Sequence, residues 1–254
     1  MLAKSPAVFA KWADRCVEAY RAATPHEGYA LLRRLQEELQ LSPRNAELCR
    51  VLHDEMNKGS RTELLDATNM PGRVFFATTN VDSMFRRAGL EHVCELHGSY
   101  ERWQCSGLAL PEDGLAPFVK FGRVCRAETW PLNDDWQPTG ALPMCRWCGK
   151  RPARPAVYHF GDAQFVSDVQ AEATFVCFAE AVAKLQLPVL LIEVGVGLRL
   201  PRLRRVLADI RAANPGAVHV RVNPREEAGE AGVRHMRDTA VNALRTLLGH
   251  EDQV

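Results

Sequence analysis

The chain has 254 residues, of which 46% are hydrophobic and 25% charged, so it is long enough for one large domain or for a domain with a small module. Its 32 Lys and Arg against 31 Asp and Glu give a net charge of +1, which argues against a surface built for nucleic acid or for an anionic membrane. No apolar run approaches the ~18 residues of a membrane span, and the first residues lack the apolar segment of a secretory signal. We therefore expect a cytoplasmic protein.

Helical periodicity dominates the N-terminal part of the chain. Apolar side chains recur there at steps of three and four residues, which predicts helices at residues 7–22, 27–41 and 45–57. From Arg73 onward, short apolar runs alternate with helical stretches. The predicted strands are residues 74–77, 156–160, 189–194 and 218–222, and the predicted helices are residues 168–187, 202–212 and 239–248. This alternation is typical of an α/β, Rossmann-like, doubly wound protein, in which helices cover both faces of a mostly parallel sheet.

Residues 106–155 interrupt the alternation with Gly, Pro, Trp and Cys, and we interpret this region as an inserted module. We therefore divide the chain into a Rossmann-like domain with N-terminal helices, at residues 1–104 and 151–254, and a small module at residues 105–150. The sequence shows no internal repeat and no low-complexity tract.

Cysteine spacing predicts a structural zinc site in this module. Cys145 and Cys148 form a Cys-x-x-Cys pair followed by glycine, which is the shape of a zinc knuckle, and Cys105 and Cys125 are the remaining candidates for a four-cysteine shell. Four thiolates would close the coordination of the metal, so the zinc would support folding rather than chemistry. The alternative is that Cys105 and Cys125 are ordinary buried thiols. The other cysteines lie on predicted helices or strands and are expected in the core: Cys16, Cys49, Cys94 and Cys177.

Polar residues follow the predicted strand at residues 74–77. Thr79, Asn80 and Asp82 stand where ligands bind in open α/β sheets, beyond the carboxyl end of a strand. The alternative is that Asn80 or Asp82 only caps the next helix. A second short apolar run ends in His97, whose imidazole can accept a proton from a hydroxyl near neutral pH, although an isolated loop histidine is more often structural.

Two further strand ends carry features that fit a nucleotide. Gly195-Val196-Gly197 would let the backbone approach a phosphate or a ribose, although an isolated Gly-x-Gly is a weak signal. Asn223 and Arg225 follow the next predicted strand, where they could hydrogen-bond a ribose or a phosphate or could form an ordinary Asn-Pro turn.

The order of these motifs resembles that of the sirtuins, the NAD-dependent protein-lysine deacylases. Residues 78–82 resemble the TQNxD segment of the family, residues 96–98 its LHG segment, and the four cysteines its paired zinc cysteines. Farther along, residues 154–162 resemble RPxVVxFGE, residues 195–197 resemble GTS, and residues 222–226 resemble INxE. The likeness covers residues 25–226 and is greatest to bacterial members.

This resemblance implies a mechanism and a set of roles. The carbonyl oxygen of an acylated lysine attacks the ribose carbon of NAD as nicotinamide leaves, and His97 accepts a ribose proton so that the acyl group moves to ADP-ribose. Asn80 and Asp82 would take part in catalysis, and the backbone at Phe160 and Gly161 would add the substrate peptide as a strand. The residues assigned to NAD are Thr79, Asn80, Asp82, Gly195, Val196, Gly197, Asn223 and Arg225.

One part of the family pattern does not occur in the sequence. Nothing before Pro25 matches the strand, the GAGxS phosphate loop and the GIPDFR-like loop with which sirtuins begin. We therefore expect this chain to lack the first strand and the phosphate loop, as an internal start within a longer protein or as a remnant, and to expose apolar strand edges. The alternatives to an active deacylase are a non-catalytic, zinc-stabilised binding protein and an NAD glycohydrolase or ADP-ribosyltransferase.

Overall fold

The computed structural model describes residues 6–41, 43–59, 62–66, 70–108, 124–134, 136–197, 201–225 and 229–249. The chain divides into two compact units. The first comprises Met1–Thr24, Thr78–Ser83 and Glu95–Asp168, and the second comprises Pro25–Ala77, Met84–Cys94 and Val169–Val254. That residues 105–150 form a separate module stays a prediction.

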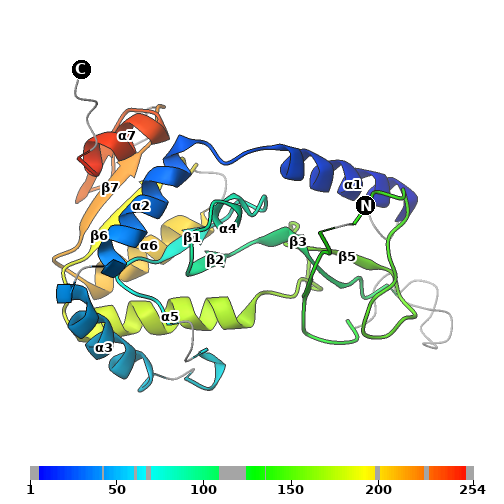
Figure 1. Ribbon diagram of the computed structural model, residues 1–254, viewed down its shortest axis with the longest axis horizontal. Helices are drawn as coiled ribbons and strands as arrows, with labels where there is room; N and C mark the ends of the chain where they lie inside the picture. Colours follow the sequence, from blue (N-terminus) through cyan, green and yellow to red (C-terminus); the bar gives the residue numbers. More distant parts are fainter. Residues whose placement is uncertain are drawn as a thin grey trace. The chain divides into compact units, whose positions relative to one another are not determined.

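The first unit is built on an antiparallel sheet of three strands in the order β4-β3-β5, of which Figure 1 labels β3 and β5. These strands are β3 (Gly98–Cys105), β4 (Trp130–Pro131) and β5 (Ala153–Val157). Helix α1 (Pro6–Ala22) packs on the sheet, where Val17 joins the buried cluster around Trp103. Arg21 of α1 also forms an ion pair of 2.7 Å with Glu101 of β3. Hydrophobic burial and this ion pair together hold α1 against β3.

Strand β5 corrects one prediction from the sequence. A strand was expected at residues 156–160 within a mostly parallel sheet, but β5 ends at Val157 and pairs antiparallel with β3. Strand β3 had no clear sequence pattern because its register shifts between Ser99 and Trp103, so buried and exposed positions do not alternate regularly along it.

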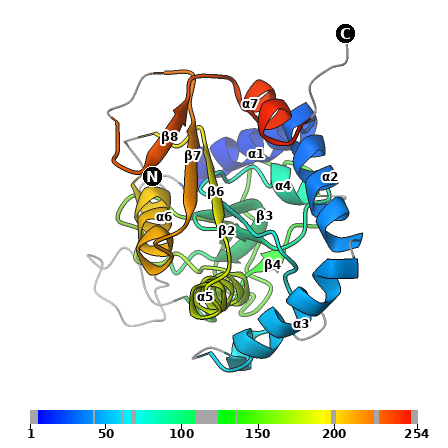
Figure 2. The same ribbon diagram turned by 90° about the vertical axis from the view of Figure 1, so that its left-hand side faces the viewer.

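The second unit contains a parallel sheet of three strands in the order β6-β7-β8, which Figure 2 shows side by side. These are β6 (Leu190–Val194), β7 (Val218–Val222) and β8 (Val233–Met236). Helix α6 (Arg202–Ala213) connects β6 to β7, and helix α7 (Ala240–Leu247) buries Ala243 against Val220 and Val222. Parallel strands joined through a helix confirm the predicted α/β class.

Helices α2 (Glu27–Leu41), α3 (Pro43–Met56) and α5 (Val169–Lys184) complete this unit, with a short 3-10 turn at Thr62–Leu64. Leu52 and Met56 of α3 pack on Cys177 and Ala181 of α5. These helices occur where the sequence predicted them. Across the described ranges, no helix has the length and the apolar character needed to cross a membrane.

Two short strands, β1 (Phe76–Thr78) and β2 (Val93–Glu95), form a sheet of their own, with helix α4 (Met84–Arg87) between them in the chain. The division between the two units runs through both strands. In the parallel sheet, β6 stands at the end of the strand order β6-β7-β8, and its Leu190 and Val194 are 56% and 39% exposed. These two apolar side chains of β6 are therefore partly open to solvent.

Candidate active site and metal centre

The turn after β1 and the turn after β2 lie against each other in the first unit. The Leu96 N–H donates to the Thr78 carbonyl at 2.8 Å, and the Tyr100 N–H donates to the Val81 carbonyl at 3.0 Å. These backbone bonds hold the two turns in register. The residues predicted to be catalytic all stand on them: Asn80, Asp82 and His97.

Three buried side chains join the same two turns. The Ser83 hydroxyl donates to Glu95 Oε1 at 2.9 Å and is also hydrogen-bonded to the hydroxyl of Ser99. Ser99 Oγ in turn accepts the Glu101 N–H at 2.9 Å. Reasoning from the sequence missed this network, although its signal was present: Ser83 directly follows Asp82, and Ser99 closes the stretch that contains His97.

His97 is largely buried, with 9% of its surface exposed, and its ring centroid lies 5.6 Å from that of Tyr158. The Tyr158 N–H donates to the His97 carbonyl at 2.9 Å, which ties the histidine to the end of β5. The next residue, Gly98, has a φ of 72°, and a Cβ there would overlap the carbonyl oxygen of Ala156. Glycine is therefore required for β3 and β5 to approach each other beside His97.

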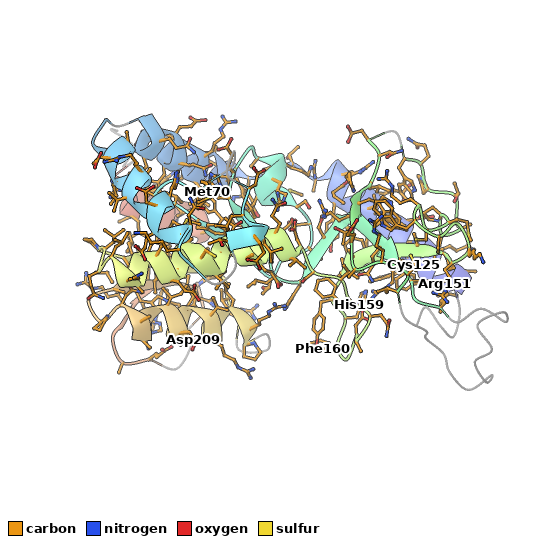
Figure 3. The ribbon with its side chains drawn as sticks, turned by 90° about the horizontal axis from the view of Figure 1, so that it is seen from below. Met70, Cys125, Arg151, His159, Phe160 and Asp209 are labelled. Atoms are coloured by element: carbon orange, nitrogen blue, oxygen red, sulfur yellow. The ribbon has the colours of Figure 1, made fainter. Side chains whose placement is uncertain are left out.

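Phe160 and Gly161, predicted to bind the substrate, lie on the turn after β5. Phe160 is 87% exposed, and its side chain projects from the turn in Figure 3. The base of the turn is held by Arg154, whose buried guanidinium lies 2.7 Å from a carboxylate oxygen of Asp162. Burial lowers the pKa of Arg154, although the charge of Asp162 acts against this. An exposed aromatic side chain thus stands on a turn with a fixed base.

The four cysteines predicted to bind zinc come together in the first unit. Their sulfur atoms all lie within 4.8 Å of one another, and the sulfurs of Cys125 and Cys145 are 3.5 Å apart. Tetrahedral zinc with Zn–S bonds of about 2.3 Å places its sulfur ligands roughly 3.8 Å apart, so the cluster could hold such an ion after small side-chain movements. The set is Cys105, Cys125, Cys145 and Cys148. Figure 3 labels Cys125 and the nearby Arg151.

The local fold favours a thiolate at one of these positions. The Gly149 N–H donates to the Cys145 carbonyl at 2.8 Å, which closes the turn of the Cys-x-x-Cys pair. Burial opposes ionisation of Cys148, but hydrogen bonds from the backbone of Lys150 and Arg151 outweigh it and lower the pKa of Cys148 to about 7. Burial instead raises the pKa of Cys125. Thiolates are the form that binds metal, so Cys148 is prepared for this role.

The predicted nucleotide residues of the second unit lie at one end of its parallel sheet. The Gly195 N–H donates to the Val222 carbonyl at 2.9 Å, and the Asn223 N–H donates to the Met236 carbonyl at 3.0 Å. The turn at Gly195–Gly197 and the turn at Asn223 are therefore adjacent. The side chain of Asn223 also accepts the Arg225 N–H at 3.1 Å, which is the turn-forming role considered as an alternative.

The predicted site residues are thus divided between the two units. The first unit holds Thr79, Asn80, Asp82, His97, Phe160 and Gly161, and the second holds Gly195, Val196, Gly197, Asn223 and Arg225. Within each unit, the residues that follow neighbouring strands lie on adjacent turns. Their assignment to NAD and to a peptide stays a prediction.

A parallel sheet with polar residues at its strand ends, together with a compact four-cysteine cluster, defines a Rossmann-like α/β protein with a candidate metal centre. The model of the Sir2 family matches residues 52–177, so the chain is similar to this family over that stretch.

Comparison with known proteins adds a sequence relative and several solved structures. NAD-dependent protein deacylase 2 of Corynebacterium efficiens is 31% identical over 100 residues, which cover 39% of this chain and 33% of that protein. The chain thus matches about a third of the length of this curated relative.

A Sir2 homologue in complex with NAD has a TM-score of 0.59 at 18% identity, over 98% of this chain and 73% of that one. Sir2Tm bound to a propionylated peptide has a TM-score of 0.60 at 17% identity, over 98% of this chain and 80% of that one. At these identities, the likeness establishes the fold.

Proposed function

We propose that this chain is an NAD-dependent protein-lysine deacylase, which transfers an acyl group to ADP-ribose and releases nicotinamide. The observation that carries the proposal is the placement of Asn80, Asp82 and His97 on two hydrogen-bonded turns, within the stretch that matches the Sir2 family. The named activity of the C. efficiens relative and the NAD and peptide complexes of the structural neighbours support it.

In this proposal, His97 is the general base. Its imidazole would accept a proton from a ribose hydroxyl, which then attacks the acyl carbon, and its position beside Tyr158 restricts the orientation of the ring. The Asn80 carboxamide and the Asp82 carboxylate would bind the ribose and the nicotinamide carboxamide, and the Thr79 hydroxyl would supply a further hydrogen bond.

The adenosine side of NAD would bind at the end of the parallel sheet in the second unit. Backbone groups of Gly195, Val196 and Gly197 can approach a sugar or a phosphate closely, because neither glycine presents a side chain. Asn223 and Arg225 would add an amide and a guanidinium on the adjacent turn.

The substrate in this proposal is an acylated lysine in an extended peptide. A strand added beside the exposed turn at Phe160 and Gly161 would bind through its main chain, so the recognition would tolerate different sequences. The near-neutral net charge of +1 supports peptide and nucleotide substrates rather than nucleic acid or a membrane surface, and we place the protein in the cytoplasm.

We further propose that the four-cysteine cluster holds one zinc ion. The four sulfur atoms would fill a tetrahedral shell and leave no position for a substrate, so the ion would stabilise the loops of the first unit. Catalysis would rest on the residues of the two turns.

The test is to incubate the purified chain with NAD and an acetyl-lysine peptide. Wild type should release nicotinamide and form O-acyl-ADP-ribose, His97→Ala should do neither, and His235→Ala, which removes an exposed histidine, should match wild type. Equal product from wild type and His97→Ala would remove His97 from the mechanism. Free ADP-ribose as the product would indicate a glycohydrolase, and zinc content without binding of NAD would indicate a non-catalytic binding protein.

A further inference from the structure

A fully buried carboxylate lies in β6, directly before the Gly195–Gly197 turn. The side chain of Glu193 has no exposed surface and points to the face of the sheet that α6 covers. Arg221 Nε donates to Glu193 Oε1 at 2.8 Å, and His219 Nε2 lies 3.2 Å from Glu193 Oε2. A carboxylate buried this completely requires such partners, because desolvation of an unpaired charge is costly.

A third partner connects this carboxylate to the turn. Arg204, in the first turn of α6, donates from Nε to Glu193 Oε1 at 3.1 Å and from Nη2 to the carbonyl of Val196 at 2.6 Å. Its side chain is only 15% exposed. One planar guanidinium therefore joins the sheet, the helix and the middle residue of the turn, a geometry that its fixed fork of donors allows and a lysine does not.

The network continues away from the turn and fixes Glu193 in place. Arg221 Nη2 donates to Glu230 Oε2 at 2.8 Å, and Arg211 Nη2 donates to Glu230 Oε1 at 2.6 Å. Burial opposes ionisation of Glu193, but His219 and the neighbouring guanidinium groups outweigh it and hold the pKa of Glu193 below its ordinary value. Glu193 is thus charged at neutral pH and anchors Arg204.

The Gly195–Gly197 turn has open space beside its two glycines in the part of the chain that the structure describes. Apart from the neighbouring residues of the chain, no atom of the described residues lies within 4 Å of the position that a Cβ would take at Gly195 or at Gly197, and Gly195 has a φ of 65°. Two glycines give this backbone large conformational freedom, which must be lost when a ligand binds. Two hydrogen bonds anchor the turn among the described residues: one from the Gly195 N–H to the Val222 carbonyl, and one from Arg204 to the Val196 carbonyl.

We propose that Arg204 is a positioning residue that, held by Glu193, fixes the Val196 carbonyl and keeps the Gly195–Gly197 turn in the shape that receives the adenosine side of NAD. The role in NAD binding rests on the proposed function. The ordering of the turn by Arg204 rests on its hydrogen bonds to Glu193 and to the Val196 carbonyl.

The binding test uses ADP-ribose titrations and steady-state kinetics with NAD. Arg204→Met keeps the apolar stem but loses both donors, and we expect it to weaken ADP-ribose binding and raise the KM for NAD by about tenfold while kcat changes less than about twofold. Arg204→Lys keeps the charge beside Glu193 and should fall between Arg204→Met and wild type. Arg205→Met removes an exposed arginine one position along α6 and should match wild type.

A second measurement needs no ligand. The Gly195 N–H is hydrogen-bonded to Val222, so its amide hydrogen should exchange slowly in wild type and several times faster in Arg204→Met and Arg204→Lys, while Arg205→Met should exchange like wild type. Unchanged exchange in both Arg204 variants would overturn the ordering role. Faster exchange with unchanged ADP-ribose affinity would overturn the role in NAD binding. Failure of wild type to bind ADP-ribose would instead refute the proposed function, and the exchange result would still decide whether Arg204 orders the turn.

Discussion

Replacement of Gly98 by alanine tests the close approach of β3 and β5 beside His97. A side chain at a φ of 72° costs about 1–2 kcal/mol, and the loss of freedom in the unfolded chain returns about 0.4–1 kcal/mol. The new methyl group would also overlap the Ala156 carbonyl and lie 2.9 Å from Phe165 Cε2, so β5 must move. Such overpacking typically costs about 1–3 kcal/mol. We expect Gly98→Ala to lower the free energy of unfolding by ~2–4 kcal/mol in total.

Gly140 offers a matched control in the same unit. Its φ is 70°, but apart from its chain neighbours no described residue has an atom within 4 Å of the position of its Cβ. Gly140→Ala should therefore carry the backbone strain without the overlap and cost about 1 kcal/mol or less. Urea unfolding of wild type and both variants at pH 7, followed by circular dichroism, measures the difference. If the two variants are destabilised equally, the close approach of the strands at Gly98 is not a constraint and the argument fails.

Three further changes test other parts of the structure. Ser83→Ala removes the hydroxyl that donates to the buried Glu95, so it should cost about 1–3 kcal/mol of stability in urea unfolding; an unchanged midpoint would show that the network between the two turns is dispensable. Glu193→Gln should cost about 3–5 kcal/mol near pH 7, because it leaves buried cations without their counter-charge. The pKa of Glu193 is lower in the folded protein than its ordinary value of 4.5, so the stability that its charge contributes is present above pH 4.5 and is lost as the pH falls through the lowered pKa. If Glu193→Gln destabilises the protein equally at pH 7 and at pH 3, this reasoning is contradicted. Removal of zinc by a chelator, or the substitution Cys148→Ser, should lower the melting temperature of the first unit. A zinc-sensitive dye added to the unfolded protein should detect one zinc ion per chain. A metal-free protein with an unchanged melting temperature would contradict a structural zinc site.

The local spacing of apolar residues was sufficient to predict most of the helices and the parallel strands β6 and β7. Strand β7 has the predicted bounds, Val218–Val222, because its three valines alternate with His219 and Arg221 between turn residues, and a period of two is typical of a strand. Strand β8 (Val233–Met236) escaped prediction because arginine and histidine occupy exposed positions within it. Strand β3 (Gly98–Cys105) also escaped prediction, because its bulge interrupts the alternation of buried residues.

The candidate site was accessible from the sequence only where it follows strand ends or pairs cysteines. Polar residues after β1 and β2, and the glycine turn after β6, follow a rule of parallel sheets that does not require coordinates. The contacts of Glu193 with Arg204 and Arg221 could not be predicted in this way, because they depend on strand register and on which face of the sheet α6 covers. A glutamate in an apolar strand was nonetheless a visible sign that buried partners exist.

The complete burial of the Glu193 side chain also determines how its ion pairs should respond to ionic strength. Mobile ions screen exposed charge pairs strongly and buried pairs weakly. The pair between Arg245 of α7 and Glu27 of α2, whose side chains are 34% and 50% exposed, should therefore weaken as sodium chloride is added. The contacts around Glu193 should persist, so this end of the parallel sheet should keep its shape in concentrated salt while the surface attachment of α7 loosens.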